Sequence, residues 1–76
     1  MNANLLAPHF ANESDRLEGL MLRRIGNRVH NLRVILLPRG MVLQGQAASY
    51  HVKQLAQHAA MELSESPILA NDIEVR

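Results

Sequence analysis

The sequence of 76 residues contains no cysteine and no tryptophan, and its aromatic side chains are limited to one tyrosine and one phenylalanine. Without cysteine the chain has neither a disulfide frame nor a thiolate metal site, so packing alone must hold the fold together. Two aromatic rings do not make a platform on which successive bases stack, which argues against a site for single-stranded nucleic acid.

The chain also lacks a strong net charge and a long apolar run. Eight Lys and Arg oppose seven Asp and Glu, so the net charge does not indicate nucleic acid as a partner, and an electrostatic function requires a local cluster. No stretch approaches the ~20 apolar residues of a membrane-spanning helix, and no basic segment typical of a signal peptide opens the sequence. We expect a cytoplasmic protein if the sequence is complete, and an envelope-associated one if it is a fragment of a larger protein.

The central part of the chain predicts a β-hairpin. The apolar run from Val34 to Leu37 stops at a proline and indicates a strand over residues 31–37. An alternating pattern over residues 41–47 predicts a second strand, joined to the first by a turn that ends at Gly40. Gly45 interrupts the second pattern and indicates a β-bulge or a close approach of another backbone segment.

Two amphipathic helices flank this hairpin. In the helix after it, over residues 49–63, Ser49 is a favourable N-cap and Ala56 belongs to a buried stripe whose alanines allow close packing on a sheet. The helix before it is expected over residues 15–25, where Leu17, Leu20, Met21 and Ile25 form the buried stripe. Ser14 or Asn12 is placed to cap this first helix, and Gly26 or Asn27 to end it in a left-handed conformation.

An alternating pattern over residues 68–75 predicts a third strand. The order is therefore αββαβ, an α+β fold with two helices on one face of a three-stranded sheet. The last strand can run parallel to the second strand through a right-handed crossover, or antiparallel to the first, and the residues do not choose between these. We expect residues 1–13 to form a tail and residues 14–76 to form one domain.

Several short motifs occur in this order of elements: Leu32-x-Val34, Leu43-Gln44-Gly45, Ser49, Ala56 and Asn71-Asp72-Ile73-Glu74-Val75. Together they resemble the BON domain over residues 14–76. The resemblance implies a mixed sheet, no enzymatic activity and no cofactor, and a role in binding phospholipids or other macromolecules at bacterial envelopes. Gly45 stands at a hallmark glycine position of that family, whereas Gly40 lies one place later than its usual turn glycine.

Four arginines of the first helix and its end form the one basic cluster of note: Arg16, Arg23, Arg24 and Arg28. In the simplest interpretation, the arginines near the helix end complement the helix dipole and keep this face solvated. In the functional interpretation, the cluster contacts the head-groups of an anionic membrane surface or the phosphates of a nucleic acid.

The sheet face that the helices leave uncovered is the second candidate surface. Alternation places Ile35, Leu37 and Val42 on that face, where polar side chains would be usual. The N-terminal residues Leu5, Leu6 and Phe10 can cover this group, or the same face of a second copy can cover it in a homodimer. We favour the homodimer, with association with another protein as the related possibility.

The histidines and serines do not form a recognisable catalytic or metal-binding constellation. His51 and His58 share a helix face, but seven residues of helix rise ~10.5 Å, which is too far for both to bind one ion. Ser49 lies close to His51, yet a capping serine uses its oxygen on backbone N–H groups, and no third residue orients the imidazole. We therefore predict no catalytic, metal or cofactor site, and no enzymatic activity.

Overall fold

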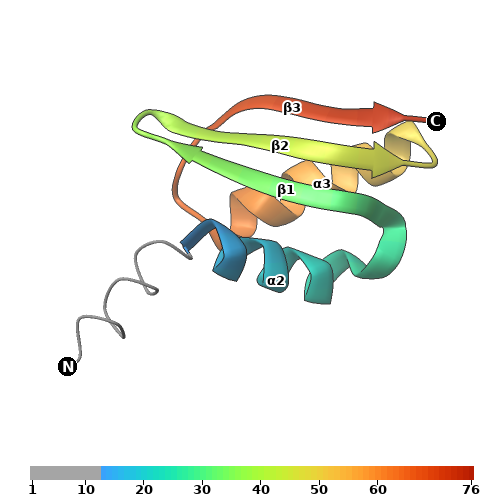
Figure 1. Ribbon diagram of the computed structural model, residues 1–76, viewed down its shortest axis with the longest axis horizontal. Helices are drawn as coiled ribbons and strands as arrows, with labels where there is room; N and C mark the ends of the chain where they lie inside the picture. The colour runs from blue at the N-terminus through green and yellow to red at the C-terminus, as the bar shows by residue number, and fades with distance from the viewer. Residues whose placement is uncertain (1–12) are drawn as a thin grey trace.

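The computed structural model describes residues 13–76, and its elements follow the predicted order αββαβ (Figure 1). The elements are α2 (Glu13–Ile25), the short 3-10 helix η1 (Gly26–Arg28), β1 (Val29–Leu37), β2 (Gly40–Ala47), α3 (Tyr50–Leu63) and β3 (Ile68–Val75). Both helices pack on one face of the three-stranded sheet, which confirms the α+β fold. The predicted tail lies outside the described residues, except for Glu13. In the described part of the chain, neither helix has the length and apolar character needed to cross a membrane.

Helix α2 begins two residues earlier than predicted, at Glu13. Ser14 therefore lies inside the helix and is not its cap, while the alternative cap Asn12 lies outside the described residues. Gly26 has a φ of +69° and provides the left-handed residue that ends the helix. Leu17, Met21 and Ile25 are buried as predicted, whereas Leu20 is only half-buried.

Strand β1 contains a bulge that explains the glycine in its neighbour β2. The pairing of the antiparallel hairpin shifts between His30 and Arg33, and Asn31 has a φ of +55°. Gly45 of β2 lies opposite this bulge, where a Cβ atom would come within 2.8 Å of Val29 Cγ1 and 2.9 Å of the His30 carbonyl oxygen. The prediction of a bulge or a close approach at Gly45 is thus confirmed in both senses, although the bulge itself is in β1. This bulge also extends β1 back to Val29, beyond its predicted start.

Gly40 lies where the chain from α3 enters the sheet. The Pro67 carbonyl oxygen accepts a hydrogen bond of 2.8 Å from the Met41 N–H. A Cβ atom at Gly40 would lie far inside van der Waals distance of that oxygen, and 3.0 Å from Leu69 Cγ. The absence of a side chain at this position therefore allows β3 to begin its pairing with β2.

Strand β3 pairs with β2 in parallel, so that β2 is central and the sheet is mixed. Helix α3 makes the crossover between these two strands, which settles the alternative left open by the sequence. Ile73 is buried, whereas Val75 is 46% exposed and Leu69 is 49% exposed. The reason is that β3 is an edge strand, with a neighbouring strand on only one side.

Helix α3 is capped as predicted, since Ser49 Oγ accepts a hydrogen bond of 3.2 Å from the Val52 N–H. The fully buried residues of α3 are alanines, including Ala56. The core combines side chains from both helices and all three strands: Leu17, Met21, Ile25, Val29, Leu32, Val34, Met41, Leu43, Ala47, Ala56, Ala59, Ala60 and Ile73.

Candidate functional site

Pairing across the sheet arranges the side chains of the open face, opposite the helices, in three transverse rows. One row runs Ile35, Val42, Ala70, the next runs Arg33, Gln44, Asp72, and the third runs His30, Gln46, Glu74. Each row takes one residue from β1, one from β2 and one from β3, in that order. The open face therefore has an apolar end near the hairpin turn and a polar end near the bulge.

The apolar patch consists of Ile35, Leu37, Val42 and Ala70. The first three were predicted to face away from the helices, and the structure brings them together, with Ile35 directly opposite Val42. Ala70 was not assigned to the patch from the sequence, because it joins only through the parallel pairing of β3 with β2. Leu37 is 45% exposed, and the other three are half-buried. Both helices of the described chain lie on the other face (Figure 1), so neither covers the patch.

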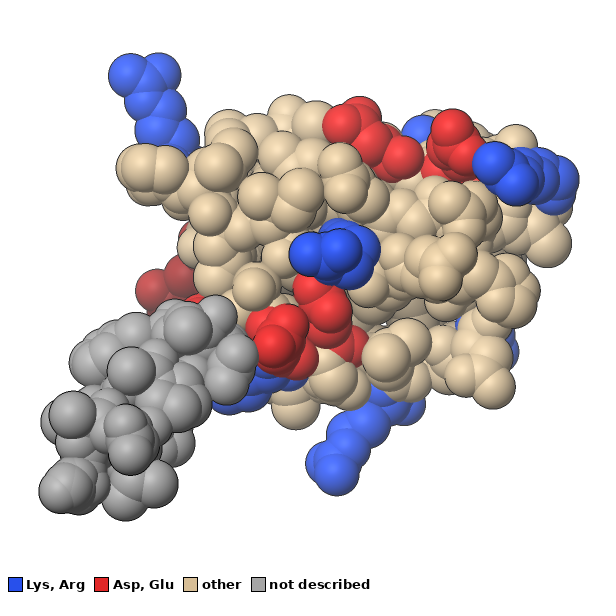
Figure 2. Space-filling view, in the orientation of Figure 1, with Lys and Arg blue, Asp and Glu red and all other residues tan. Residues whose placement is uncertain are grey.

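Charges of opposite sign lie on opposite sides of the open face. Figure 2 shows acidic side chains over β3 and, across an uncharged area, a basic side chain on the β1 side that has acidic side chains directly beside it. Arg33 on β1 is 70% exposed, and its Nε lies 3.8 Å from Glu18 Oε2. Asp72 on β3 is exposed and makes no side-chain hydrogen bond or ion pair within residues 13–76.

A shallow hollow lies in the open face between β2 and β3. It has a volume of about 260 Å³ and is lined by Gln44, Gly45, Gln46, Asp72 and Glu74. Only backbone of Gly45 borders the hollow, since a Cβ atom at that position would point toward Val29 and His30 of β1. The carboxylates and amides of the other lining residues offer oxygen acceptors. Glu74 is already paired with Arg76 and Gln46 Oε1 accepts a hydrogen bond from Asn31, so Asp72 is the carboxylate of the hollow that has no partner within residues 13–76.

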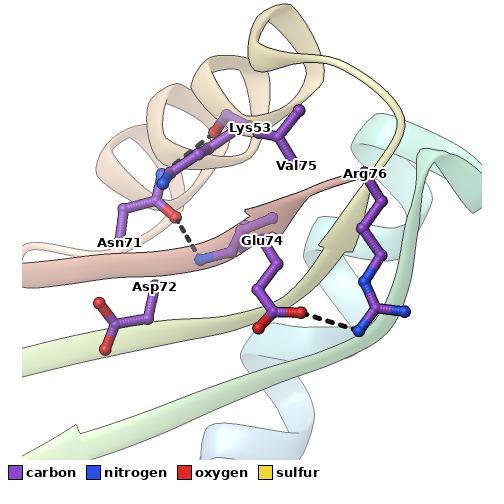
Figure 3. Close-up of a pocket in the computed structure, with 7 residues that line it drawn as sticks. Lys53, Asn71, Asp72, Glu74, Val75 and Arg76 are labelled. Atoms are coloured by element: carbon purple, nitrogen blue, oxygen red, sulfur yellow. Dashed lines mark hydrogen bonds and ion pairs between the residues drawn. The ribbon is translucent and has the colours of Figure 1, made fainter.

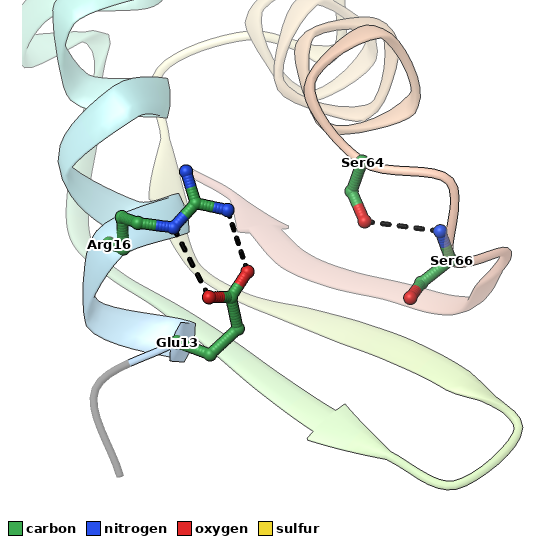
Figure 4. A network of polar contacts seen from close by, with 4 residues as sticks. All are labelled: Glu13, Arg16, Ser64 and Ser66. Atoms are coloured by element: carbon green, nitrogen blue, oxygen red, sulfur yellow. Dashed lines mark hydrogen bonds and ion pairs between the residues drawn. The ribbon is translucent and has the colours of Figure 1, made fainter. Parts of the chain in front are cut away.

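The four arginines predicted as an anion-binding cluster have different surroundings. Arg16 forms two hydrogen bonds with Glu13, of 3.1 and 2.7 Å (Figure 4), which lower the pKa of Glu13 and raise that of Arg16. Arg24 pairs with Glu62 of α3. Arg23 and Arg28 are exposed and have no carboxylate partner in the described part of the chain. The structure therefore leaves two of the four without an ion pair.

The outer edge of β3 borders a wide hollow of about 700 Å³ (Figure 3). Asn71 donates hydrogen bonds to the Lys53 carbonyl (3.1 Å) and to Gln57 Oε1 (3.2 Å), and its Oδ1 accepts one from the Ile73 N–H (3.2 Å). These bonds tie α3 to β3 and occupy an outward N–H of the edge strand. The polar groups of Asn71 therefore serve the fold.

The opposite edge of the sheet is protected in a similar way. Glu18 of α2 accepts a hydrogen bond of 2.9 Å from the Val34 N–H, and its side chain is only 18% exposed. The carboxylate thus occupies a backbone donor that would otherwise be available for pairing with another strand. Each edge thus carries one such side-chain bond, and the open face presents an apolar patch that neither helix of the described chain covers.

The histidines of the described chain, His30, His51 and His58, are all exposed. Within residues 13–76, no three His, Asp or Glu side chains come close enough to hold a metal ion. Ser49, which is near His51 in sequence, accepts the α3 capping bond with its hydroxyl.

Comparisons of this chain with protein-family models, with curated proteins and with solved structures give no match.

Proposed function

We propose that this domain is a non-catalytic protein-interaction module that binds its partner through the open face of the sheet. The observation that carries this proposal is the apolar patch of Ile35, Leu37, Val42 and Ala70, on the face that neither helix covers. An open face of an antiparallel or mixed sheet is normally polar when it faces water. A contiguous apolar group on such a face is typical of a contact surface.

Burial of this patch contributes favourably to association and offsets part of the entropy cost of binding. Full burial of an aliphatic side chain contributes about 1.5–3 kcal/mol. The side chains of the patch are half-buried in the domain, so a partner that covers them adds part of this energy. A domain of this size also has a small core, so that association which buries the patch stabilises the fold as well.

Ile35→Lys is expected to abolish association of the full chain, because it places a charge at the centre of the patch. Light scattering over a range of protein concentrations measures the effect. Leu22→Lys is the matched control, since Leu22 is 42% exposed on α2 and lies outside the patch. Equal association of wild type, Ile35→Lys and Leu22→Lys would show that the open face is not the binding surface.

A second candidate function is weak binding to anionic phospholipid, which the resemblance to the BON domain implies. The observation that favours it is the exposure of Arg23 and Arg28 near the end of α2, without carboxylate partners among residues 13–76. Each arginine near an anionic bilayer contributes about 1 kcal/mol, so two unpaired arginines support only salt-sensitive adhesion.

Co-sedimentation with vesicles tests this second candidate. The double variant Arg23→Glu/Arg28→Glu is expected to bind anionic vesicles no better than neutral ones at low salt, because it replaces attraction by repulsion. Arg39→Glu, at the hairpin turn, is the control for a change of charge elsewhere and should retain more binding. Wild-type recovery that is equal on neutral and anionic vesicles would reject the lipid function.

A further inference from the structure

The three rows of the open face have an order that makes the face complementary to itself. In the second row a cation on β1, Arg33, is followed by the neutral Gln44 on β2 and by an anion on β3, Asp72. The apolar row places a large side chain on β1, Ile35, and a small one on β3, Ala70. Charge and size therefore both change across the face in the direction from β1 to β3.

We propose that the occupant of the open face is a second copy of this chain, related to the first by a two-fold axis parallel to β2. This inference rests on the proposed function of that face. Such an axis places β1 of one copy over β3 of the other, and β2 over β2. Two sheets packed face to face are about 10 Å apart with their strands aligned to within about 30°, a geometry that three-stranded faces can adopt.

This arrangement pairs each kind of side chain with its complement. Arg33 of one copy faces Asp72 of the other, and the symmetry repeats the pair on the opposite side. Ile35 lies over the small Ala70, and Val42 meets Val42 on the axis. The hollow beside Asp72, lined by carboxylate and amide groups, accommodates the Arg33 guanidinium.

A two-fold axis perpendicular to the strands gives a poorer fit. It places β1 over β1, so that the three rows of one copy are reversed over those of the other. When Val42 lies on that axis, Arg33 faces Leu37 of the other copy and leaves its charge over an apolar side chain. When Gln44 lies on the axis, Arg33 faces Arg33 and Asp72 faces Asp72. The order of the rows therefore selects the axis along β2.

The expected dimer is weak. A face of three strands about 4.8 Å apart and about eight residues long covers only a few hundred Å² on each copy. This is less than the total of ~1,000 Å² that a stable specific interface needs, and is the size of a weak, transient contact. Association is therefore measured by sedimentation equilibrium of the full chain at concentrations up to about 1 mM.

Charge exchange between two variants tests the axis. In Arg33→Asp, two pairs of carboxylates face each other across the interface, and in Asp72→Arg two pairs of guanidinium groups do so. Each variant alone is expected to have a dimer dissociation constant at least about tenfold above that of wild type, because two attractive pairs become repulsive. An equimolar mixture of the two variants restores both pairs, and is expected to associate at least as tightly as wild type.

Two further measurements test whether weaker association has a cause other than the loss of these charge pairs. Asp72→Asn and Asp72→Arg form a graded series that leaves Arg33 and its contact with Glu18 in place, and their dissociation constants should rise in that order. Arg39→Asp makes the same change of charge as Arg33→Asp, but outside the rows, and should leave the dissociation constant within about twofold of wild type. Far-UV circular dichroism establishes that each variant is folded.

The outcomes separate this inference from the proposed function. If Ile35→Lys dissociates the dimer but the charge variants and their mixture behave as wild type, the open face is the interface and the axis is wrong. If Ile35→Lys also has no effect, both proposals are wrong. A wild-type chain that stays monomeric over the whole range, and that associates after Leu5→Ser/Phe10→Ser, would assign the patch to the N-terminal residues and overturn the dimer.

Discussion

Gly45→Ala is expected to lower the free energy of unfolding by about 2–6 kcal/mol. Two costs combine at this position. The residue has a φ of +148°, where a side chain strains the backbone by ~1–3 kcal/mol. The new Cβ atom also meets Val29 Cγ1 at 2.8 Å and the His30 carbonyl oxygen at 2.9 Å, and overpacking of this kind costs ~1–3 kcal/mol. The contact with a backbone oxygen is the harder to relieve, because the bulge of β1 holds that oxygen in place.

Urea denaturation followed by far-UV circular dichroism measures this effect. Gly19→Ala is the matched control, since Gly19 lies in α2 and a Cβ atom there meets nothing within 4 Å. That change is expected to stabilise the domain by ~0.4–1 kcal/mol, because alanine restricts the unfolded chain and favours helix. A Gly45→Ala midpoint equal to that of wild type would mean that β1 moves away at little cost.

Leu43→Ala is expected to destabilise the domain by about 2–5 kcal/mol. Leu43 lies on the central strand and is completely buried between the sheet and the helices. Its truncation removes apolar contacts with the core and leaves a cavity that the surrounding elements close only in part. A stability of ~0.05–0.15 kcal/mol per residue is typical of small domains, so this loss is a large share of the total.

Leu22→Ala provides the comparison for Leu43→Ala in the same denaturation experiment. Leu22 is 42% exposed on α2, and alanine is a good helix former. We expect its midpoint to remain close to that of wild type. Similar losses for Leu22→Ala and Leu43→Ala would contradict the assignment of Leu43 to the centre of the core.

Periodicity was sufficient to predict the elements and most of the core. The spacing of Leu17, Met21 and Ile25 identifies the buried side of α2, and Ser49 marks the start of α3 through a local hydrogen bond. These features depend on residues within a few positions of each other, so they can be predicted from the local sequence. The start of α2 was predicted two residues late for a related reason, since neighbouring polar residues offer several alternative caps.

The sequence also indicated which residues of the hairpin face away from the helices. Alternation along a strand assigns Ile35, Leu37 and Val42 to the open face without knowledge of any partner strand. Whether a face is covered depends on where the helices pack, and both lie on the other side, as in the predicted αββαβ fold.

Tertiary structure decided the features that depend on register between distant segments. Ala70 joins the apolar patch, and Asp72 comes level with Arg33, only because β3 pairs in parallel with β2. Long-range pairing likewise determined that Glu62 binds Arg24, which removes one arginine from the predicted anion-binding cluster. If β3 were shifted by one residue along β2, its two faces would be exchanged. Asp72 would then no longer lie on the open face in the row of Arg33. The spacing of residues within one strand does not determine this register. The packing of α3 and the close approach of Pro67 to Gly40 set it.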